Sequence, residues 1–182
     1  MEYRRKNGRN CVEVALVNLL IFRGDYLAVR DVEANYSLSS LVREGGDTNP
    51  GLVTRLVRDI TKGKYDALLH VDWGNDIREI IREYYPGNAD HLVSIFEEET
   101  RKGNIHGDEE VIELSTYPYI TFHDNSYGWS HAVVSLGNEQ YLNDGEIIGK
   151  KEMKKLELNP NPVAYLEVIK ANQKSSQHQP QD

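Results

Sequence analysis

The segment NCVEVALVNLLIFRGD, residues 10–25, is the first strongly periodic stretch of this 182-residue chain. Its apolar side chains recur at the spacing of a helix with a broad buried face: Val14, Leu16, Val17, Leu20 and Ile21. Asn10 is the predicted N-cap, because its side chain can accept a hydrogen bond from an amide of the first turn. Cys11 then occupies the first helical position, and Arg23-Gly24-Asp25 ends the helix.

Outward from this helix, the apolar pattern predicts further helices first and strands later. Helices are expected after the loop Gly45–Pro50 and as far as Ile60, over 76–84, over 90–102 with Asp90 as cap and an end near Gly103, and around 151–156. Strands are expected at 65–71, 117–123, 131–136, 139–143 and 163–169, with a hairpin turn at Gly137-Asn138. This order predicts an α+β fold with a mostly antiparallel sheet. We expect one domain, residues 1–171, and a disordered Gln-, Ser- and Pro-rich tail, residues 172–182.

The composition excludes several classes of protein. The chain is 39% hydrophobic and 27% charged, which is typical of a soluble globular domain. Its net charge of −8 is spread along the sequence, which argues against a nucleic-acid partner, and the basic start around Arg4-Arg5-Lys6 reads as a solvated edge. Since no apolar run is long enough to span a bilayer, we expect no membrane partner. A lone cysteine cannot form an internal disulfide, so we expect a reduced, cytoplasmic protein.

Cys11 is the first candidate for chemistry. A thiol at a helix N-terminus sits at the positive end of the helix dipole, which favours the nucleophilic thiolate. The structural alternative is a small buried hydrophobic residue, which many cysteines are.

A thiolate nucleophile needs an acid–base partner, and His131 is the best placed of the six histidines. It immediately precedes the apolar run Ala132–Leu136, so its side chain is expected at the beginning of a strand. The turn at Gly137-Asn138 brings Asn143 and Asp144 back beside it, where either could orient the imidazole. Taken singly, His131 could be an ordinary strand-end histidine and Asp144-Gly145 an ordinary turn.

These residues together resemble the papain-like cysteine peptidase superfamily, and within it the C39-like peptidase domains. The resemblance covers most of residues 5–170. It is carried by Asn10-Cys11 with the following helix, the loop and helix 45–60, Tyr117–Phe122, Ser130–Val134, Tyr141–Gly145 and the closing stretch 151–169. It implies a papain-like fold in which the helix that carries the nucleophile packs on the sheet. It also implies that Cys11 attacks a carbonyl, His131 transfers the proton and Asp144 orients His131, with Asn143 as the alternative.

The chain departs from the family pattern at three places. Arg5 stands where members usually carry the glutamine that stabilises the oxyanion, Val12 follows the cysteine where glycine is common, and Gly145 follows Asp144 where proline is common. The missing glutamine matters because the loss of an oxyanion donor costs about 100- to 1000-fold in rate. Arg5 or Asn7 could replace the glutamine beside the Cys11 amide. Trp129 and Tyr127 could line a substrate groove, or simply form a packed loop.

The expected function is therefore hydrolysis of a peptide or amide bond through an acyl-enzyme at Cys11. The expected substrate is a peptide or protein, and no cofactor or metal is expected, since the Cys and His spacing does not fit a zinc site. Two alternatives stay open. One is an acyltransferase or deamidase on the same scaffold, and the other is a catalytically inactive peptide-binding module.

Overall fold

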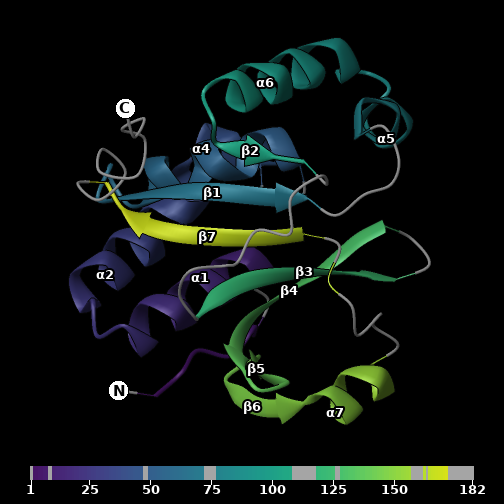
Figure 1. The fold of residues 1–182 in the computed structure, drawn as a ribbon. Helices are drawn as coiled ribbons and strands as arrows, with labels where there is room; N and C mark the ends of the chain where they lie inside the picture. The colour runs from purple at the N-terminus through teal and green to yellow at the C-terminus, as the bar shows by residue number, and fades with distance from the viewer. Residues whose placement is uncertain are drawn as a thin grey trace, which may run out of the picture.

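The computed structural model describes residues 2–7, 10–46, 49–71, 77–107, 118–125, 128–156, 162 and 164–171. These residues form an α+β fold (Figure 1). In chain order the elements are α1 (Cys11–Phe22), α2 (Tyr26–Asn35), the 3-10 turn η1 (Tyr36–Leu38), α3 (Ser40–Arg43), α4 (Pro50–Ile60), β1 (Tyr65–Val71), α5 (Ile77–Tyr84), α6 (Ala89–Arg101), β2 (Ile105–His106), β3 (Tyr119–Asn125), β4 (Gly128–Gly137), β5 (Gln140–Asn143), β6 (Glu146–Gly149), α7 (Lys150–Lys155) and β7 (Ala164–Lys170).

The described strands form one mixed seven-stranded sheet in the order β2-β1-β7-β3-β4-β5-β6. Only β1 and β2 pair in parallel within this sheet, and the other neighbours are antiparallel. In Figure 1, α1 and α4 lie behind the sheet. The sheet is therefore mostly antiparallel, as the sequence predicted, with helices α1 and α4 on one of its faces.

Helix α1 begins and ends where its sequence indicates. Asn10 has an extended backbone and its side chain accepts from the Val12 amide at 2.8 Å, so it is the N-cap. At the other end Gly24 adopts a positive φ of 73°, its amide bonds to Ile21, and the amide of Asp25 bonds to Leu20. This pair of bonds is a Schellman motif, which needs a residue that tolerates the left-handed conformation.

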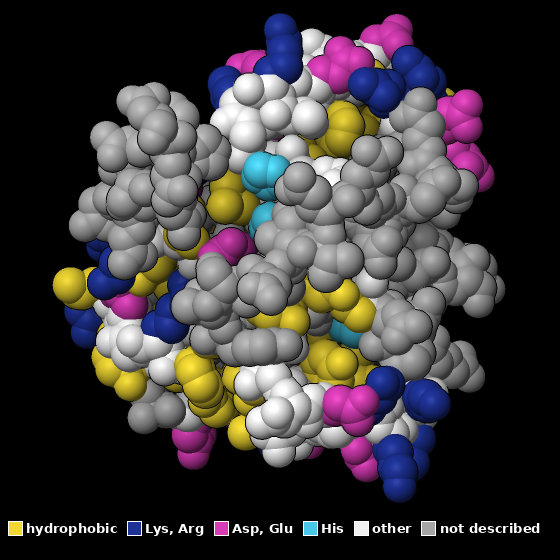
Figure 2. Space-filling model, viewed as in Figure 1, with side chains coloured by type: hydrophobic (Ala, Val, Ile, Leu, Met, Phe, Trp, Pro, Cys, Tyr) yellow, Lys and Arg dark blue, Asp and Glu magenta, His cyan; other side chains and the backbone are white. Residues whose placement is uncertain are grey.

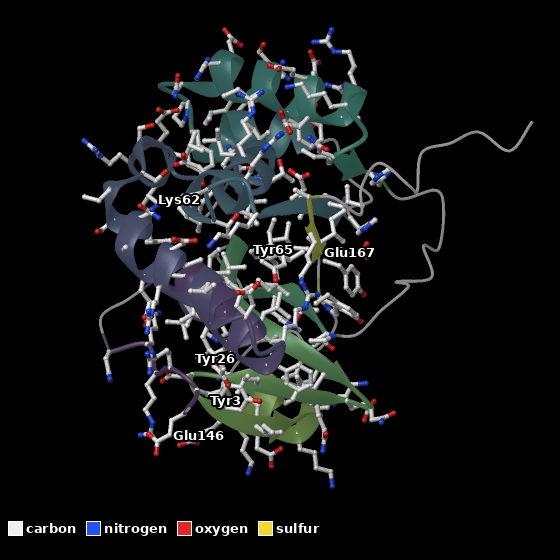
Figure 3. All side chains as sticks on the ribbon, turned by 90° about the vertical axis from the view of Figure 1, so that its left-hand side faces the viewer. Tyr3, Tyr26, Lys62, Tyr65, Glu146 and Glu167 are labelled. Carbon is white, nitrogen blue, oxygen red and sulfur yellow. The ribbon has the colours of Figure 1, made fainter. Side chains whose placement is uncertain are left out.

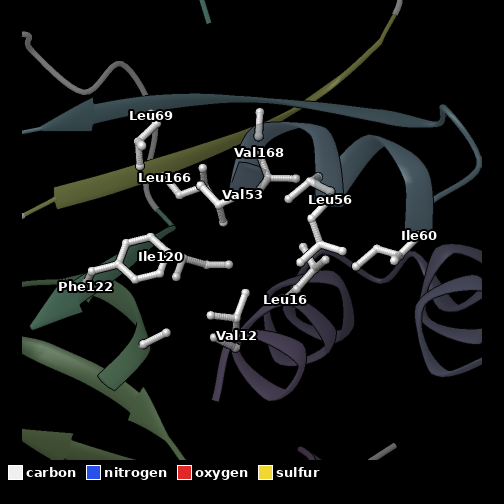
Figure 4. Packing of buried hydrophobic residues seen from close by; sticks show 14 of the residues in the cluster. Val12, Leu16, Val53, Leu56, Ile60, Leu69, Ile120, Phe122, Leu166 and Val168 are labelled. Carbon is white, nitrogen blue, oxygen red and sulfur yellow. The ribbon is translucent and has the colours of Figure 1, made fainter. Parts of the chain in front are cut away.

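The hydrophobic core fills the space between the helices and the sheet (Figure 4). In this view Val12 of α1 lies nearest Ile120 of β3, and Leu16 of α1 lies toward Leu56 of α4. Most of α1 is buried because α2 packs against it as well as β4. The first turn of α1, with Cys11, is thus anchored to the sheet by its neighbour Val12.

Alternation along β4 assigns its side chains to two faces. Ala132 and Val134 belong to the core that contains α1, whereas Val133 packs with Met153 of α7. Because successive side chains of a strand point to opposite faces, His131 lies on the same face as Val133. It lies inside β4, opposite His123 of β3, so the prediction that His131 opens its strand was wrong. The hairpin β3–β4 begins three residues earlier, at Gly128.

Other differences from the predicted elements are local. Helix α2 was not predicted, nor were the short elements η1, α3, β2 and β6. Asp90 lies in the first turn of α6 rather than at its cap, which is Asn88. The predicted tail at 172–182 lies outside the described residues, and the domain boundary at 171 stays a prediction. None of the helices in the described ranges combines the length and hydropathy that crossing a bilayer requires.

Replacement of Gly46 by alanine is expected to destabilise the fold by about 1–3 kcal/mol, because a β-carbon there would lie 2.6 Å from the carbonyl oxygen of Leu41. That oxygen is backbone and accepts from the Gly46 amide at 2.7 Å, so it cannot move without loss of the turn. Urea unfolding measures the change. Gly87→Ala is the matched control, since its β-carbon meets open space, and we expect a change within about 0.5 kcal/mol. Equal stability of both variants would contradict the packing described for Gly46.

Candidate active site

Cys11 is the first residue of α1 and is half-buried. It carries a free thiol. The first amides of a helix have no carbonyl partner within it, so the Cys11 amide is available to stabilise a negative charge. The predicted place of Cys11 at the helix N-terminus is confirmed.

His131 is held by Asn143 of β5. Its Nε2 lies 2.7 Å from Oδ1 of Asn143. Because an amide oxygen can only accept, Nε2 carries the proton in the neutral ring and Nδ1 keeps its lone pair. This contact fixes both the orientation and the tautomer of the imidazole, leaving Nδ1 as the atom that can accept a proton.

The local environment disfavours the charged form of His131. Burial lowers the pKa of His131, while the hydrogen bond that its ring donates to Asn143 partly offsets that effect. Two charges act in addition: the ammonium of Lys6 lowers the pKa and the carboxylate of Asp144 raises it. Among the residues that surround the ring, Lys6 was not identified from the sequence as part of the site.

Asp144 makes a different contact from the predicted one. It lies in the turn between β5 and β6 with a positive φ of 47°, and its carboxylate accepts from the backbone amide of Lys6. The contact predicted for Asp144, a hydrogen bond to His131, is made by Asn143, the alternative. The reason is strand alternation: Asn143 is the last residue of β5 and shares the face of His131, whereas Asp144 has left the strand.

The two oxyanion candidates precede α1. The guanidinium of Arg5 bonds to Glu146 at 3.0 Å, and the two side chains are 64% and 66% exposed. A pair so exposed contributes little to stability and leaves the guanidinium free to exchange partners. Asn7 is exposed and adopts a positive φ of 35°. Both stay candidates, and the Cys11 amide is the donor that the helix itself positions.

Other histidines have different surroundings. His123 is fully buried and its Nε2 lies 2.9 Å from the Thr121 hydroxyl, so solvent and substrate cannot reach it. His70 is stacked on His106 with ring centroids 5.2 Å apart, on strands β1 and β2. Figure 2 shows histidine side chains on the near face of the molecule, away from α1 and α4. Within the described residues, no group of three or more His, Cys, Asp or Glu side chains is arranged to hold a metal.

The thiol and the imidazole come from the two sides of β4. Helix α1 packs on the face of Ala132 and Val134, and His131 projects from the other face. In the described part of the chain, no hydrogen bond joins the Cys11 thiol to His131. The structure thus brings His131, Asn143, Asp144 and the backbone of Lys6 together, and carries Cys11 on the helix that follows Lys6.

A pocket of about 330 Å³ opens beside Asn143. Asp144 and Arg5 are among its lining residues, and Ile148 and Leu156 supply apolar surface. Of the predicted groove residues, Tyr127 falls outside the described residues, and so does the side chain of Trp129, whose backbone pairs with Asp124. The pocket at the end of β5 was not predicted from the sequence.

Comparison with known proteins adds no family: no family model, curated protein or solved structure matches this chain.

In a Cys11→Ser variant, His131 is expected to titrate below its ordinary value of about 6.5, because burial is the largest influence on it. The neutral imidazole then contributes stability above that pH, and the contribution is lost as the pH falls through the folded-state pKa. NMR titration of the ring protons measures the midpoint. Lys6→Met should raise it and Lys62→Met, the control, should not. A His131 midpoint above 6.5 that is the same with and without Lys6→Met would contradict the environment described for His131.

Proposed function

We propose that this protein is a papain-like thiol hydrolase that cleaves a peptide or amide bond through an acyl-enzyme at Cys11. The observation that carries the proposal is the hydrogen bond between His131 Nε2 and Asn143, which leaves Nδ1 as a base of defined orientation. The position of Cys11 in the first turn of α1 supports it, and so does the resemblance to C39-like peptidase domains.

The reaction follows from these roles. Nδ1 of His131 takes the proton of the Cys11 thiol, and the thiolate attacks the carbonyl carbon of the substrate. The oxygen of the tetrahedral intermediate gains the negative charge, which the Cys11 amide stabilises. The imidazolium then gives its proton to the leaving amine, and the C–N bond breaks. Water attacks the thioester with Nδ1 as base, which releases the acid and restores the thiol.

In this reaction Asn143 accepts a hydrogen bond from His131 in both protonation states of the ring. Its Oδ1 accepts from Nε2–H of the neutral ring and of the imidazolium alike. Since the ring is half-buried, a fixed acceptor also offsets part of the cost of charging it. This is why an amide suffices where a carboxylate was predicted from the sequence.

The decisive experiment is the pH dependence of Cys11 alkylation by iodoacetamide in the wild type and in His131→Ala. A thiolate paired with an imidazolium reacts well below pH 8, and loss of the imidazole should move the midpoint toward that of an ordinary thiol, about 8.5. His91→Ala is the matched control, because His91 is an exposed histidine on α6. A thiol-like midpoint in the wild type, unaffected by His131→Ala, would refute the proposal.

The distance between the two reacting groups can be tested as well. 1,3-Dibromoacetone carries two alkylating carbons, so it bridges a thiol and an imidazole only when they lie within reach of one short linker. We expect a bridge between the peptides that contain Cys11 and His131, detected by mass spectrometry after proteolysis. Single attachment at Cys11 without a bridge to His131 would place the imidazole out of reach.

A second candidate function is a peptide-binding module without catalysis. It is favoured by Arg5, whose guanidinium bonds to Glu146 and stands where the resemblance places the oxyanion glutamine. The binding module is also favoured because α1 and His131 lie on opposite faces of β4. An unreactive Cys11 in the alkylation experiment, with retained binding of peptides, would select this function over hydrolysis.

A further inference from the structure

The segment that leads to Cys11 is held on one side by helix α1. The amide of Arg4 donates to Oδ1 of Asn18 at 2.6 Å, and Nδ2 of Asn18 donates to the Arg4 carbonyl at 2.9 Å. Asn18 is 1% exposed, and a buried polar side chain needs hydrogen-bond partners. The backbone of Arg4 supplies them to Asn18 within an otherwise apolar helix. The two bonds explain why an asparagine interrupts the apolar pattern of α1.

On its other side, the same segment is held by the turn between β5 and β6. The Lys6 amide donates to the carboxylate of Asp144. Gly145 adopts a φ of +85°, and a β-carbon there would lie 3.1 Å from Arg5 Cγ and 3.3 Å from the Arg4 carbonyl oxygen. Only glycine combines that φ with so close an approach. Figure 3 shows the same neighbourhood, with Tyr3 and Glu146 at the junction of the N-terminal segment, α1 and the strands β5 and β6.

Residues 4–6 therefore connect the two parts of the candidate site. Asn143, which orients His131, immediately precedes Asp144, and Cys11 is five residues after Lys6 in the sequence. We infer that Asp144 is a positioning residue: by holding the Lys6 amide it sets the place of Cys11 relative to the His131–Asn143 pair. The inference rests on the proposed function, and it gives Asp144 a role other than the orientation of His131.

Geometry and charge make separable contributions at Asp144. Its carboxylate is a hydrogen-bond acceptor for Lys6, and its charge raises the pKa of His131. Asparagine at this position keeps an acceptor oxygen and tolerates the positive φ, but removes the charge. Glycine keeps the positive φ and removes both the acceptor and the charge. The two substitutions thus distinguish positioning from electrostatics.

The test compares iodoacetamide alkylation of Cys11 at pH 6.5 in the wild type, Asp144→Asn and Asp144→Gly. A displaced catalytic group costs up to about 100-fold in rate, so we expect alkylation about tenfold slower in Asp144→Gly and within about twofold of wild type in Asp144→Asn. Glu139→Gly is the matched control, expected within about twofold. Glu139 is also an acidic residue with positive φ, 57°, in a turn at the other end of β5, and it bonds to Lys150.

Hydrogen exchange of the Lys6 amide gives a second readout, which should become about tenfold faster in Asp144→Gly and stay unchanged in Asp144→Asn. If alkylation in the wild type does not depend on His131, the proposed function fails and the inference fails with it. If it does depend on His131 but Asp144→Gly labels as fast as wild type, only the inference is overturned. An Asn variant as slow as the Gly variant also overturns it, since charge would then be the cause.

Discussion

We expect the wild-type protein to release a burst of nitrophenolate from p-nitrophenyl acetate, and we expect Cys11→Ser to remove that burst, with acylation at least about 10³-fold slower. The activated ester needs no specific substrate pocket, so it reports the nucleophile alone. In the wild type the burst should equal one nitrophenolate per Cys11, because deacylation by water is slower than attack by the thiolate. Serine fails because its hydroxyl is not ionised by the helix dipole and a neutral histidine.

The fold should survive this substitution. Cys11 is half-buried at the edge of the core and the change removes no large side chain, so we expect unfolding free energies within about 1 kcal/mol of each other. Mass spectrometry of the acylated protein should locate the acetyl group on Cys11. A full burst in Cys11→Ser, or acetyl found on another residue, would contradict the assignment of the nucleophile.

The parts of the fold that the sequence predicted are those set by local pattern. Helix α1 has an unambiguous cap at Asn10 and a left-handed end at Gly24, and both lie in one short stretch. The turn between β4 and β5 is likewise local, but it lies one residue later than predicted: Gly137 pairs with Gln140, and the turn residues Asn138 and Glu139 adopt positive φ, 51° and 57°. Such features need no knowledge of distant contacts.

The elements that were missed depend on tertiary structure. Helix α2 buries only Ala28, Val29 and Val32, too few apolar positions to stand out as a helical stripe. Strand β2 is two residues long, and β6 is an edge strand of four residues. They exist because a neighbouring strand offers hydrogen bonds, which single-sequence periodicity does not report.

The candidate site divides in the same way. Cys11 and His131 could be chosen from residue type and spacing, but the partner of His131 depends on a one-residue difference in register. Asn143 is still in β5 and faces His131, while Asp144 turns away to Lys6. The roles of Lys6 and Asn18 depend on where residues 4–6 pack, which no motif records.

Asn143→Ala is therefore the substitution that separates the two assignments of the orienting residue, and we expect it to slow acylation by p-nitrophenyl acetate about 100-fold. Without Oδ1 the ring of His131 can rotate and exchange tautomers, and a wrong histidine tautomer costs about 10⁴-fold in a Ser-His-Asp triad. Asn143→Asp should retain most of the rate, since a carboxylate accepts from Nε2 as well, and should raise the pKa of His131.

The matched variant is Asp144→Asn, which changes the adjacent residue and leaves the Asn143 contact intact. We expect its acylation rate within about twofold of wild type. The opposite result, a large loss in Asp144→Asn with little change in Asn143→Ala, would make Asp144 the orienting group, as its place in the sequence predicted. In that case the turn between β5 and β6 would have to bring the Asp144 carboxylate onto His131 in solution, and the bond from the Lys6 amide would have to break.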